Sequence, residues 1–416
     1  MKKTIKLAVV AALALGATSA FATNGSNMIG MGAKARGMAG TGIGLSHGAE
    51  SALTNPALIT TVKGTEISFG GTVFMPDVKN DNTLVDGSGN AYSTGYQDSA
   101  ADMNVIPEVS LATKITDHFY AGIGMWGTAG MGTDYRDTAG ANQGGTQFQM
   151  VTNLQLMQFG VPLAYKTNGF SVAVTPILQY GSLDINYDTN TSAAAVGGNG
   201  AGVAQDLKFG YNIGLAYTIK GLTVGATYVS RIDMDYKDQL PNAMAGFGIN
   251  YTNTELSTPA TYGLGASYVF GANTVGLDYK RIKWSDAKGY EDFQWDDQDV
   301  VSLGYEYNAK NWAVRAGYNY ATSPISEQSS LATPAGSTFA GSYAGLINTF
   351  NLLGFPAIVE SHYAVGGTYN INKATSVDLA FTYAPEKTET FKNFYGQNVS
   401  TKHSQTGLSA QVNFDF

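Results

Sequence analysis

The sequence predicts an all-β protein, a transmembrane antiparallel β-barrel of fourteen strands with an N-terminal hatch that plugs its lumen. Three observations lead to this prediction. Apolar and aromatic residues alternate with small or polar residues over long runs, only 13% of the residues are charged, and short turns alternate with long connecting segments. A barrel is the form of sheet that can face lipid, because an open edge would leave unpaired backbone groups in hydrocarbon.

The first element, residues 1–22, is predicted to be a cleaved signal peptide. Its positive charges come from Lys2, Lys3 and Lys6. An apolar run over 7–16 and a small-x-small site at 20–22 follow, so we expect the mature chain to begin at Thr23. The alternative is a membrane anchor, but the apolar run is well short of the ~20 residues that a spanning helix needs.

The second element, residues 23–64, is predicted to be a plug. It does not alternate and consists mainly of small residues with scattered methionines. Such a segment can fold compactly inside a narrow lumen. Residues 49–53 are expected to form a short helix that ends before Asn55-Pro56, since proline terminates a helix.

The third element, residues 65–416, is predicted to be the barrel. Between 207 and 219 every second residue is apolar or aromatic, and the pattern recurs at 170–174, 301–307, 312–320, 377–383 and 408–416. Successive side chains of a strand point to opposite faces, so one face would be apolar. A soluble β-sandwich alternates too, but several runs here reach ~12 residues, beyond the usual ~5–6 of globular sheets and sufficient for a tilted membrane crossing.

Aromatic residues near the ends of the apolar faces are typical of interfacial girdles in outer-membrane barrels. They include Tyr217, Tyr228, Tyr268, Tyr279, Trp284, Trp312 and Tyr320. The chain ends on Phe416, and a terminal aromatic residue on the lipid face resembles the assembly signal of outer-membrane proteins.

The connections alternate in length, and six short and seven long ones would join fourteen strands. Short polar turns are predicted at 116–117, 167–169, 220–221, 271–273, 308–311 and 372–373. Long segments are predicted at 77–101, 131–147, 189–205, 237–257, 288–297, 326–358 and 386–402. We expect the short turns to be periplasmic and the long loops extracellular. The first strand, about 66–76, must pair with the last, about 404–416, because a barrel in lipid has to close.

The plug carries a family resemblance. Residues 37–42, Gly-Met-Ala-Gly-Thr-Gly, and 52–58, Ala-Leu-Thr-Asn-Pro-Ala-Leu, resemble the N-terminal hatch of the FadL/TodX family of outer-membrane transporters for hydrophobic compounds. The resemblance implies a kinked third strand with a lateral opening beside Asn55, Pro56 and Ala57. That strand, 118–130, contains the glycines Gly122, Gly124, Gly127 and Gly130, which permit bends and bulges. Alternatively, these glycines simply fill a crowded interior.

Two loops are candidate capture surfaces for an apolar substrate. The first, 326–358, contains Phe339, Leu346, Ile347, Phe350, Leu353 and Phe355, and its spacing over 343–353 permits an amphipathic helix. The second, 237–257, contains Met244 and Phe247. An equally weighted alternative is that the helix packs on its own loop neighbours or caps the barrel.

Charged residues on expected lumen-facing positions are Lys208, Asp278, Lys280, Glu306, Arg315 and Asp378. A cation among them, for example Lys208 or Arg315, would suit the carboxylate of a fatty acid. The favoured interpretation is that these charges pair with each other or with Lys34 and Arg36 of the hatch.

The composition excludes several classes of site and partner. Cysteine is absent, which excludes disulfides, zinc-thiolate sites, iron–sulfur clusters and cysteine nucleophiles. Without the three signal lysines, 21 basic residues face 32 acidic ones, a net charge of −11 that argues against a nucleic-acid partner. The four histidines lack metal-ligand spacing, and glycine pairs such as Gly122-x-Gly124 lack the helix that a dinucleotide site needs.

We therefore expect no enzyme and no cofactor, but a monomeric passive transporter of hydrophobic compounds in the outer membrane, in contact with its lipid and lipopolysaccharide. Fatty acids, alkanes and monoaromatic compounds all remain open as substrates. Two alternatives stay open as well. A general diffusion porin predicts an open, strongly charged lumen, and an adhesin predicts long loops that bind another cell.

Overall fold

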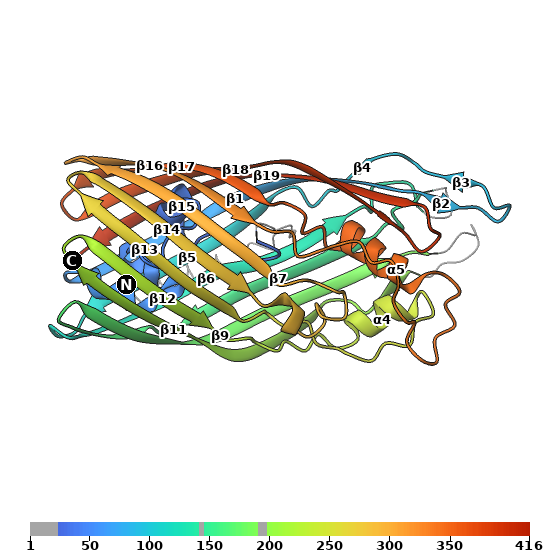
Figure 1. Cartoon of the computed structure of the whole chain (residues 1–416), viewed down its shortest axis with the longest axis horizontal. Coiled ribbons are helices and arrows are strands. Elements are labelled where there is room, and N and C mark those ends of the chain that lie inside the picture. Colours follow the sequence, from blue (N-terminus) through green and yellow to red (C-terminus); the bar gives the residue numbers. More distant parts are fainter. Residues whose placement is uncertain (1–23, 141–144, 190–197) are drawn as a thin grey trace, which may run out of the picture.

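The chain forms a closed antiparallel barrel of fourteen strands, as the sequence predicts. The computed structural model describes residues 24–140, 145–189 and 198–416 (Figure 1), so the predicted signal peptide lies outside the described residues. The barrel strands are β1 (Thr65–Asn82), β5 (Asn104–Lys114), β6 (Phe119–Asp134), β7 (Val151–Gly160) continued by β8 (Leu163–Thr167), β9 (Phe170–Tyr187), β11 (Ala204–Ile219), β12 (Leu222–Val229), β13 (Thr261–Phe270), β14 (Asn273–Ile282), β15 (Gln298–Asn308), β16 (Trp312–Ala321), β17 (Ser361–Asn372), β18 (Thr375–Lys392) and β19 (Asn398–Asp415). Short accessory strands in the loops are β2 (Leu84–Val85), β3 (Ala91–Tyr92), β4 (Gln97–Asp98) and β10 (Asn199–Gly200).

The first and last strands close the barrel, which confirms the predicted pairing. β1 pairs with β19 from Glu66 opposite Asp415 to Asn82 opposite Val399. Thr65 N donates to the Phe416 carbonyl at 3.1 Å, and Phe416 N donates back to the Thr65 carbonyl at 2.8 Å. No edge is therefore left at this junction for lipid to meet.

Several strands continue further than the alternation of apolar residues indicates. The predicted long loop at 386–402 is wrong, because β18 runs to Lys392 and β19 begins at Asn398. The extension pairs polar residues across the hairpin, as in the 2.7 Å contact between the Thr390 and Ser400 hydroxyls. Outside the membrane a strand can carry polar side chains on both faces, so an apolar pattern cannot mark where such a strand ends.

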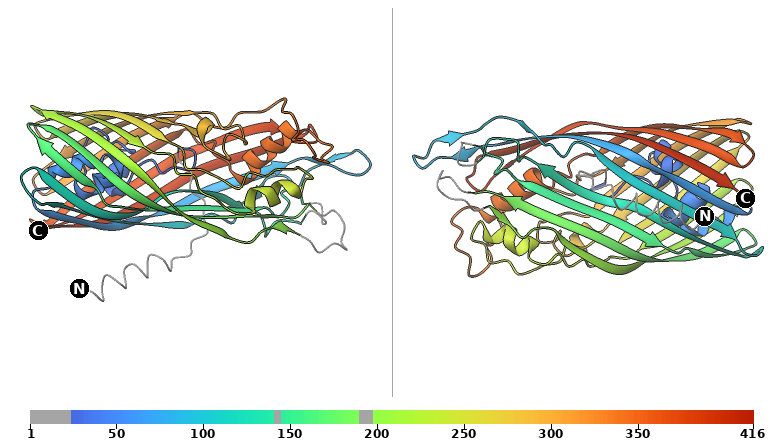
Figure 2. Two further views of the ribbon diagram at one scale, coloured as in Figure 1. Left: turned by 90° about the horizontal axis from the view of Figure 1, so that it is seen from below. Right: turned by 180° about the vertical axis from the view of Figure 1, so that it is seen from behind.

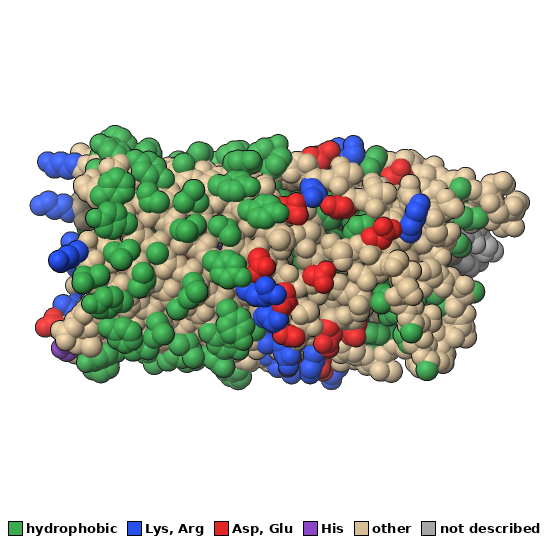
Figure 3. All heavy atoms as spheres, viewed as in Figure 1, with side chains coloured by type: hydrophobic (Ala, Val, Ile, Leu, Met, Phe, Trp, Pro, Cys, Tyr) green, Lys and Arg blue, Asp and Glu red, His purple; other side chains and the backbone are tan. Residues whose placement is uncertain are grey.

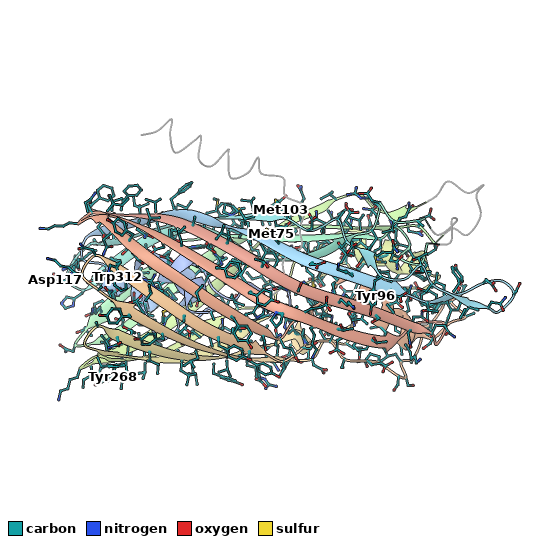
Figure 4. All side chains as sticks on the ribbon, turned by 90° about the horizontal axis from the view of Figure 1, so that it is seen from above. Met75, Tyr96, Met103, Asp117, Tyr268 and Trp312 are labelled. Carbon is teal, nitrogen blue, oxygen red and sulfur yellow. The ribbon has the colours of Figure 1, made fainter. Side chains whose placement is uncertain are left out.

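The outer surface carries the predicted apolar face. The outward residues of β11 are exposed, Phe209 at 80%. Figure 3 shows apolar side chains as a broad band around the short-turn half of the barrel, with charged side chains gathered along its border toward the long loops. Trp312 and Tyr268 lie near the short turns and point outward (Figure 4). This band is the surface that we expect to face hydrocarbon.

The helices α4 (Gln239–Ala245) and α5 (Tyr343–Thr349) lie among the loops at the opposite end (Figures 1 and 2), and α5 continues into a π-helical turn, η5 (Phe350–Gly354). A short 3₁₀ helix, η4 (Trp284–Asp286), follows β14. The helix predicted over 343–353 is thus present. Of the helices in the described ranges, none has the length and apolar character to cross a membrane.

The hatch fills the lumen toward the short-turn end (Figure 1). Its elements are α2 (Gly32–Gly37), η1 (Gly48–Glu50), α3 (Ser51–Thr54) and η2 (Pro56–Thr61). The helix predicted over 49–53 ends at Thr54, and Asn55 then caps η2 by accepting a hydrogen bond from Ala57 N at 3.1 Å. Gly37 of α2 lies so close to β17 that a Cβ on Gly366 would sit 2.9 Å from its Cα. A bulkier residue at either position would push the hatch off the wall.

Candidate functional site

The hydrogen-bond ladder between β5 and β6 ends part of the way up the barrel. It runs from Lys114 opposite Tyr120 to Glu108 opposite Trp126 and then stops. β5 itself continues to Asn104 and stays paired with β1 along its other edge. The next residue of β5 is Pro107, and proline has no N–H to donate and occurs at strand edges or bulges. Above this point the described residues of β5 and β6 do not pair with each other.

β6 turns inward where the ladder ends. Every residue from 124 to 135 is buried, so the alternation between an inner and an outer face is lost. The pairing with β7 shifts at the same place, with Gly127 opposite Met157 and Ala129 opposite Leu156. Thr128 is therefore the extra residue of a β-bulge, and a bulge bends the strand that carries it.

The N-terminal residues take the place of β5 beside the bulge. Met28 N donates to the Thr128 carbonyl at 3.1 Å, and Gly130 N donates to the Ser26 carbonyl at 3.0 Å. Higher up, Ala100 N donates to the Asp134 carbonyl at 2.7 Å. The backbone groups that β6 would offer to β5 are thus partly satisfied by other segments, as burial requires.

The hatch binds β5 on the other side of the same junction. Both terminal nitrogens of Arg36 donate to the Glu108 carboxylate at 2.6 Å, and Gly32 N lies 3.3 and 3.2 Å from its two oxygens. Both side chains are buried, Arg36 with only 1% exposed. A bidentate pair is the strongest and most directional form of this contact. Glu108 was not predicted, because nothing in the sequence marks it as the partner of Arg36.

A cavity of about 130 Å³ lies between the N-terminal residues, the hatch and the wall. Its lining includes Met28, Ile43, Leu53, Val229, Pro259 and Ile282 as apolar members. Lys280 of β14 also lines it; among the described residues its ammonium group makes no direct hydrogen bond or ion pair, and Asp278 attracts it from a longer distance. Two buried oxygens on the lining, Asn24 Oδ1 and Thr128 Oγ1, have no hydrogen-bond partner within residues 24–140, 145–189 and 198–416. The cavity is therefore largely apolar with a few unsatisfied polar groups.

The other predicted lumen charges are mostly paired, as the favoured interpretation holds. Arg315 contacts Glu306 at 2.6 Å and Asp378 at 3.6 Å. Asp378 also lies 3.9 Å from Lys34 of the hatch. Arg315 is therefore compensated and has little capacity left for an anionic ligand.

Two more of the predicted charges lie apart from Arg315. Asp278 accepts hydrogen bonds from the backbone of Gly42 and Ile43 at 2.6 and 2.8 Å, so it anchors the hatch. Lys208 is partly exposed, 3.4 Å from Asp206, and does not line the cavity.

The segment that begins at Asn55 contacts several strands of the wall, and its predicted role at a lateral opening stays a prediction. Asn55 Nδ2 donates to the Ile43 carbonyl at 2.7 Å and to the Leu215 carbonyl of β11 at 3.1 Å, and η2 packs against β6, β8, β9 and β11. The bulge itself is bonded by residues 26–28. Of the predicted glycines, Gly122 and Gly124 lie in the paired part of β6, opposite Ala112 and Ser110, and Gly127 borders the bulge.

The predicted capture residues form a buried cap and not an exposed patch. Six of them are buried, and Phe339 and Phe247 are half-buried; the buried ones are Leu346, Ile347, Phe350, Leu353, Phe355 and Met244. Phe247 is central, with its ring 5.2 Å from Tyr187, 5.5 Å from Phe394 and 5.7 Å from Phe350. The expected amphipathic helix packs on its loop neighbours, because Phe247, which follows α4, and Phe293 supply aromatic partners to Phe350 that spacing alone does not indicate.

A second aromatic group lies below this cap. Trp284 is fully buried, which corrects its predicted place in the outer girdle, and its ring centre is 4.7 Å from Tyr290 and 5.0 Å from Trp295. A Cβ on Gly25 would collide with the Trp284 ring. Burial raises the pKa of the Tyr290 hydroxyl, which is hydrogen-bonded by Ser26, so Tyr290 is a neutral partner. The same N-terminal residues that bond β6 therefore also touch this group.

The described ranges contain no group of three His, Asp or Glu side chains arranged to hold a metal ion. His362 Nε2 lies 3.2 Å from Gln405, whose amide also lies 3.2 Å from His403 Nε2. Buried polar side chains are normally hydrogen-bonded, so we assign a structural role to these two histidines.

Comparison with known proteins adds sequence relatives. A family model described as "Outer membrane protein transport protein (OMPP1/FadL/TodX)" matches residues 7–342. The chain is 26% identical to the 47 kDa outer membrane protein of Pasteurella multocida, over 90% of this chain and 92% of that protein. A further match, 44% identical over 84 residues, is an uncharacterized protein from the phosphoenolpyruvate carboxykinase gene 5′ region of Chlorobium limicola, where it covers 20% of this chain and 41% of that protein.

Solved structures share the fold. A FadL homologue of Pseudomonas aeruginosa aligns with a TM-score of 0.68 at 16% identity, over 94% of this chain and all of that one. The toluene transporter TodX of P. putida aligns with a TM-score of 0.64 at 18% identity, over 93% of this chain and 99% of that one. The toluene transporter TbuX of Ralstonia pickettii aligns with a TM-score of 0.62 at 17% identity, over 93% and 99%. At these identities the likeness concerns the fold alone.

Proposed function

This chain belongs to the outer membrane protein transport family (OMPP1/FadL/TodX), and from that premise we propose that it passively carries hydrophobic compounds across the outer membrane and releases them sideways into the lipid. The single observation that supports lateral release is the end of the β5–β6 ladder at Glu108 and Trp126. Everywhere along a paired wall, a substrate would have to break ladder hydrogen bonds to leave. Here it would pass between strands that do not bond each other.

We call the boundary between β5 and β6 above Glu108 and Trp126, where the two strands do not pair, the seam. Its outer border suits an apolar exit. Met103, directly before β5, is 57% exposed, and Val105 is 37% exposed. Met103 lies near Met75 of β1 on the outer surface (Figure 4). On the inner side, Met28, Phe74 and Ile106 form a small buried apolar cluster. An apolar molecule would therefore meet apolar side chains on both sides of the wall.

The cavity beside the bulge supports a more specific ligand, a hydrophobic molecule with an anionic end such as a fatty acid. Lys280 would hold the anionic group, because its ammonium group lies on the cavity lining and makes no hydrogen bond to a described residue, although the Asp278 carboxylate attracts it from a longer distance. The Thr128 hydroxyl, also on the lining, would donate a further hydrogen bond to a carboxylate, whereas Asn24 Oδ1 is an acceptor and gains nothing from it. A plain hydrocarbon would leave both Lys280 and the Thr128 hydroxyl unsatisfied.

The remaining assignments complete this proposal. Residues 1–22 would be removed on export, 23–64 would form the hatch, and 65–416 would form the barrel. The long-loop end would face outward into lipopolysaccharide, where the cap around Phe247 would have to open for a substrate to enter. The apolar band would contact outer-membrane lipid, and we expect a monomer, since the barrel closes on itself.

Liposomes that contain the purified protein test the proposal against a general diffusion porin. We expect uptake of a fluorescent fatty acid into the bilayer and no steady ionic conductance, because the hatch fills the lumen. Steady conductance of the full-length protein without fatty-acid uptake would favour the porin and overturn the proposal. Adhesion of whole cells in the absence of either activity would favour the adhesin.

A further inference from the structure

A single N-terminal segment holds both strands that part at the seam. Residues 26–28 bond β6 at Thr128 and Gly130, and Arg36 with Gly32 bonds β5 at Glu108. We call residues 26–36 the strap. It begins on one edge of the seam and ends on the other.

The two attachments lie at matching heights. Glu108 is opposite Trp126 in the last rung of the ladder, and the bulge at Thr128 begins two residues above it. The strap therefore takes over where direct pairing ends. Its backbone supplies the bonds that β6 has lost, and a buried ion pair supplies the hold on β5.

The strap is itself anchored, so it can resist movement of the strands. Ala33 N donates to Gln411 Oε1 of β19 at 3.2 Å, and α2 packs against β17, β18, β19 and β1, the strands that precede β5 around the wall. A buried bidentate pair tolerates little change in distance or angle. Without this anchoring the two strands could either pair with each other above Glu108 or separate further, since no β5–β6 ladder holds their distance there.

We propose that the strap is a spacer that fixes the separation of β5 and β6, with Arg36 and Glu108 as its positioning residues. The spacer prevents β5 and β6 from forming a continuous hydrogen-bond ladder, and it also prevents them from separating so far that the lumen opens to ions. This inference rests on the proposed lateral release for its purpose, but it concerns a distance that can be measured without any substrate.

Spin labels measure that distance in the full-length protein in lipid nanodiscs. The chain has no cysteine, so Val105→Cys on β5 and Asp137→Cys just beyond β6 give two unique and exposed attachment sites. A control pair at Leu277 and Leu303, directly opposite each other on β14 and β15, reports a fully paired part of the wall. Heat-modifiable migration on gels confirms that each variant has assembled.

We expect Glu108→Gln to broaden and shift the distance distribution between Val105 and Asp137 while the control pair stays narrow. Arg36→Met/Glu108→Met removes both charges and should broaden it equally, because the tie is still lost. The matched control is Asp278→Asn, which loosens the hatch from β14 instead, and there the seam distance should not change.

An unchanged distribution in Glu108→Gln would overturn the spacer. So would a native distribution in the double methionine variant, since the pair would then only compensate a buried charge. If Glu108→Gln fails to assemble, Arg36→Lys is read in the same way, because lysine keeps the charge but lacks the bidentate fork. A changed distance with unaltered fatty-acid uptake would keep the spacer and contradict lateral release.

Discussion

Trp126 Nε1 donates a hydrogen bond to the Ser110 hydroxyl at 2.8 Å and so ties the last rungs of the β5–β6 ladder together. The indole is buried and lies over Gly124 and Gly160, where a Cβ would press into its ring. The two glycines thus make room for a large side chain at the foot of the seam. This tie defines where the paired wall ends.

Trp126→Ala should loosen the foot of the seam. A large cavity and a lost hydrogen-bond partner would cost about 3–5 kcal/mol, and we expect a lower denaturant midpoint for the refolded barrel in detergent. Trp312→Ala is the matched control, because that indole is exposed on the outer surface. Equal midpoints for the two variants would contradict the role of Trp126.

Gly124→Val should impair assembly of the barrel and not merely straighten β6. Its side chain would collide with the Trp126 ring, and Gly122→Val would meet the Leu111 carbonyl in the same way. The fraction of protein that folds into a heat-modifiable barrel measures this effect. Gly87→Val is the control, since nothing lies within 4 Å of a Cβ at that loop position. Normal assembly of Gly124→Val would contradict this prediction, since it would show that the Trp126 ring can move to make room for the valine side chain.

Lys280→Met should weaken transport of a fatty acid roughly 10- to 100-fold, the worth of a hydrogen bond to a charged group. Transport of a neutral hydrocarbon of similar length should not fall, because methionine keeps the cavity apolar. Competitive uptake of the two compounds into liposomes measures the ratio. Lys288→Met, on the outer rim beside Glu255, is the control. Equal losses for both compounds would sink the assignment of Lys280 to the anionic group.

Phe247→Ala should open the loop cap. Each ring pair that is lost costs about 0.5–1.5 kcal/mol, and Phe247 contributes to several. We expect faster protease cleavage in the loops around α4 and α5, with an unaltered barrel core. Tyr395→Ala, at a more exposed ring of the same cap, should have a smaller effect. Protection equal to that of the unmodified protein would show that the cap does not depend on Phe247.

Much of the barrel follows from the sequence because lipid imposes a local rule. Every second residue must be apolar, so the period of two places the strands and the gaps in it place the turns. Beyond the membrane the strands face water, and their residues no longer need to alternate between apolar and polar. For this reason β18 and β19 continue through the predicted loop at 386–402 without an apolar pattern that would mark them.

The candidate site is less predictable, because its contacts join residues far apart in the chain. Arg36 and Glu108 are separated by 72 positions, and no local pattern pairs them. The bulge at Thr128 depends on Ser26 and Met28 replacing a neighbouring strand. Two local signals were available: the glycines of strand three predicted a bend, and Gly127 borders the bulge; Pro107, a proline inside an alternating run, marks an edge and lies next to the end of the ladder.

Lateral release is tested most directly by stapling the seam. A Cβ on Gly127 would lie 3.8 Å from the Cβ of Ile106, the usual separation in a disulfide, ~3.8 Å, and no other cysteine competes. In liposomes that contain Ile106→Cys/Gly127→Cys, fatty-acid uptake should be lost when the disulfide forms and should return when it is reduced, with the single variant Ile106→Cys unaffected by oxidation; Gly127→Cys alone is no control, because its Cβ would lie 2.6 Å from Ile106 Cγ2. Uptake that is equally fast in the oxidised and reduced protein would contradict release between β5 and β6.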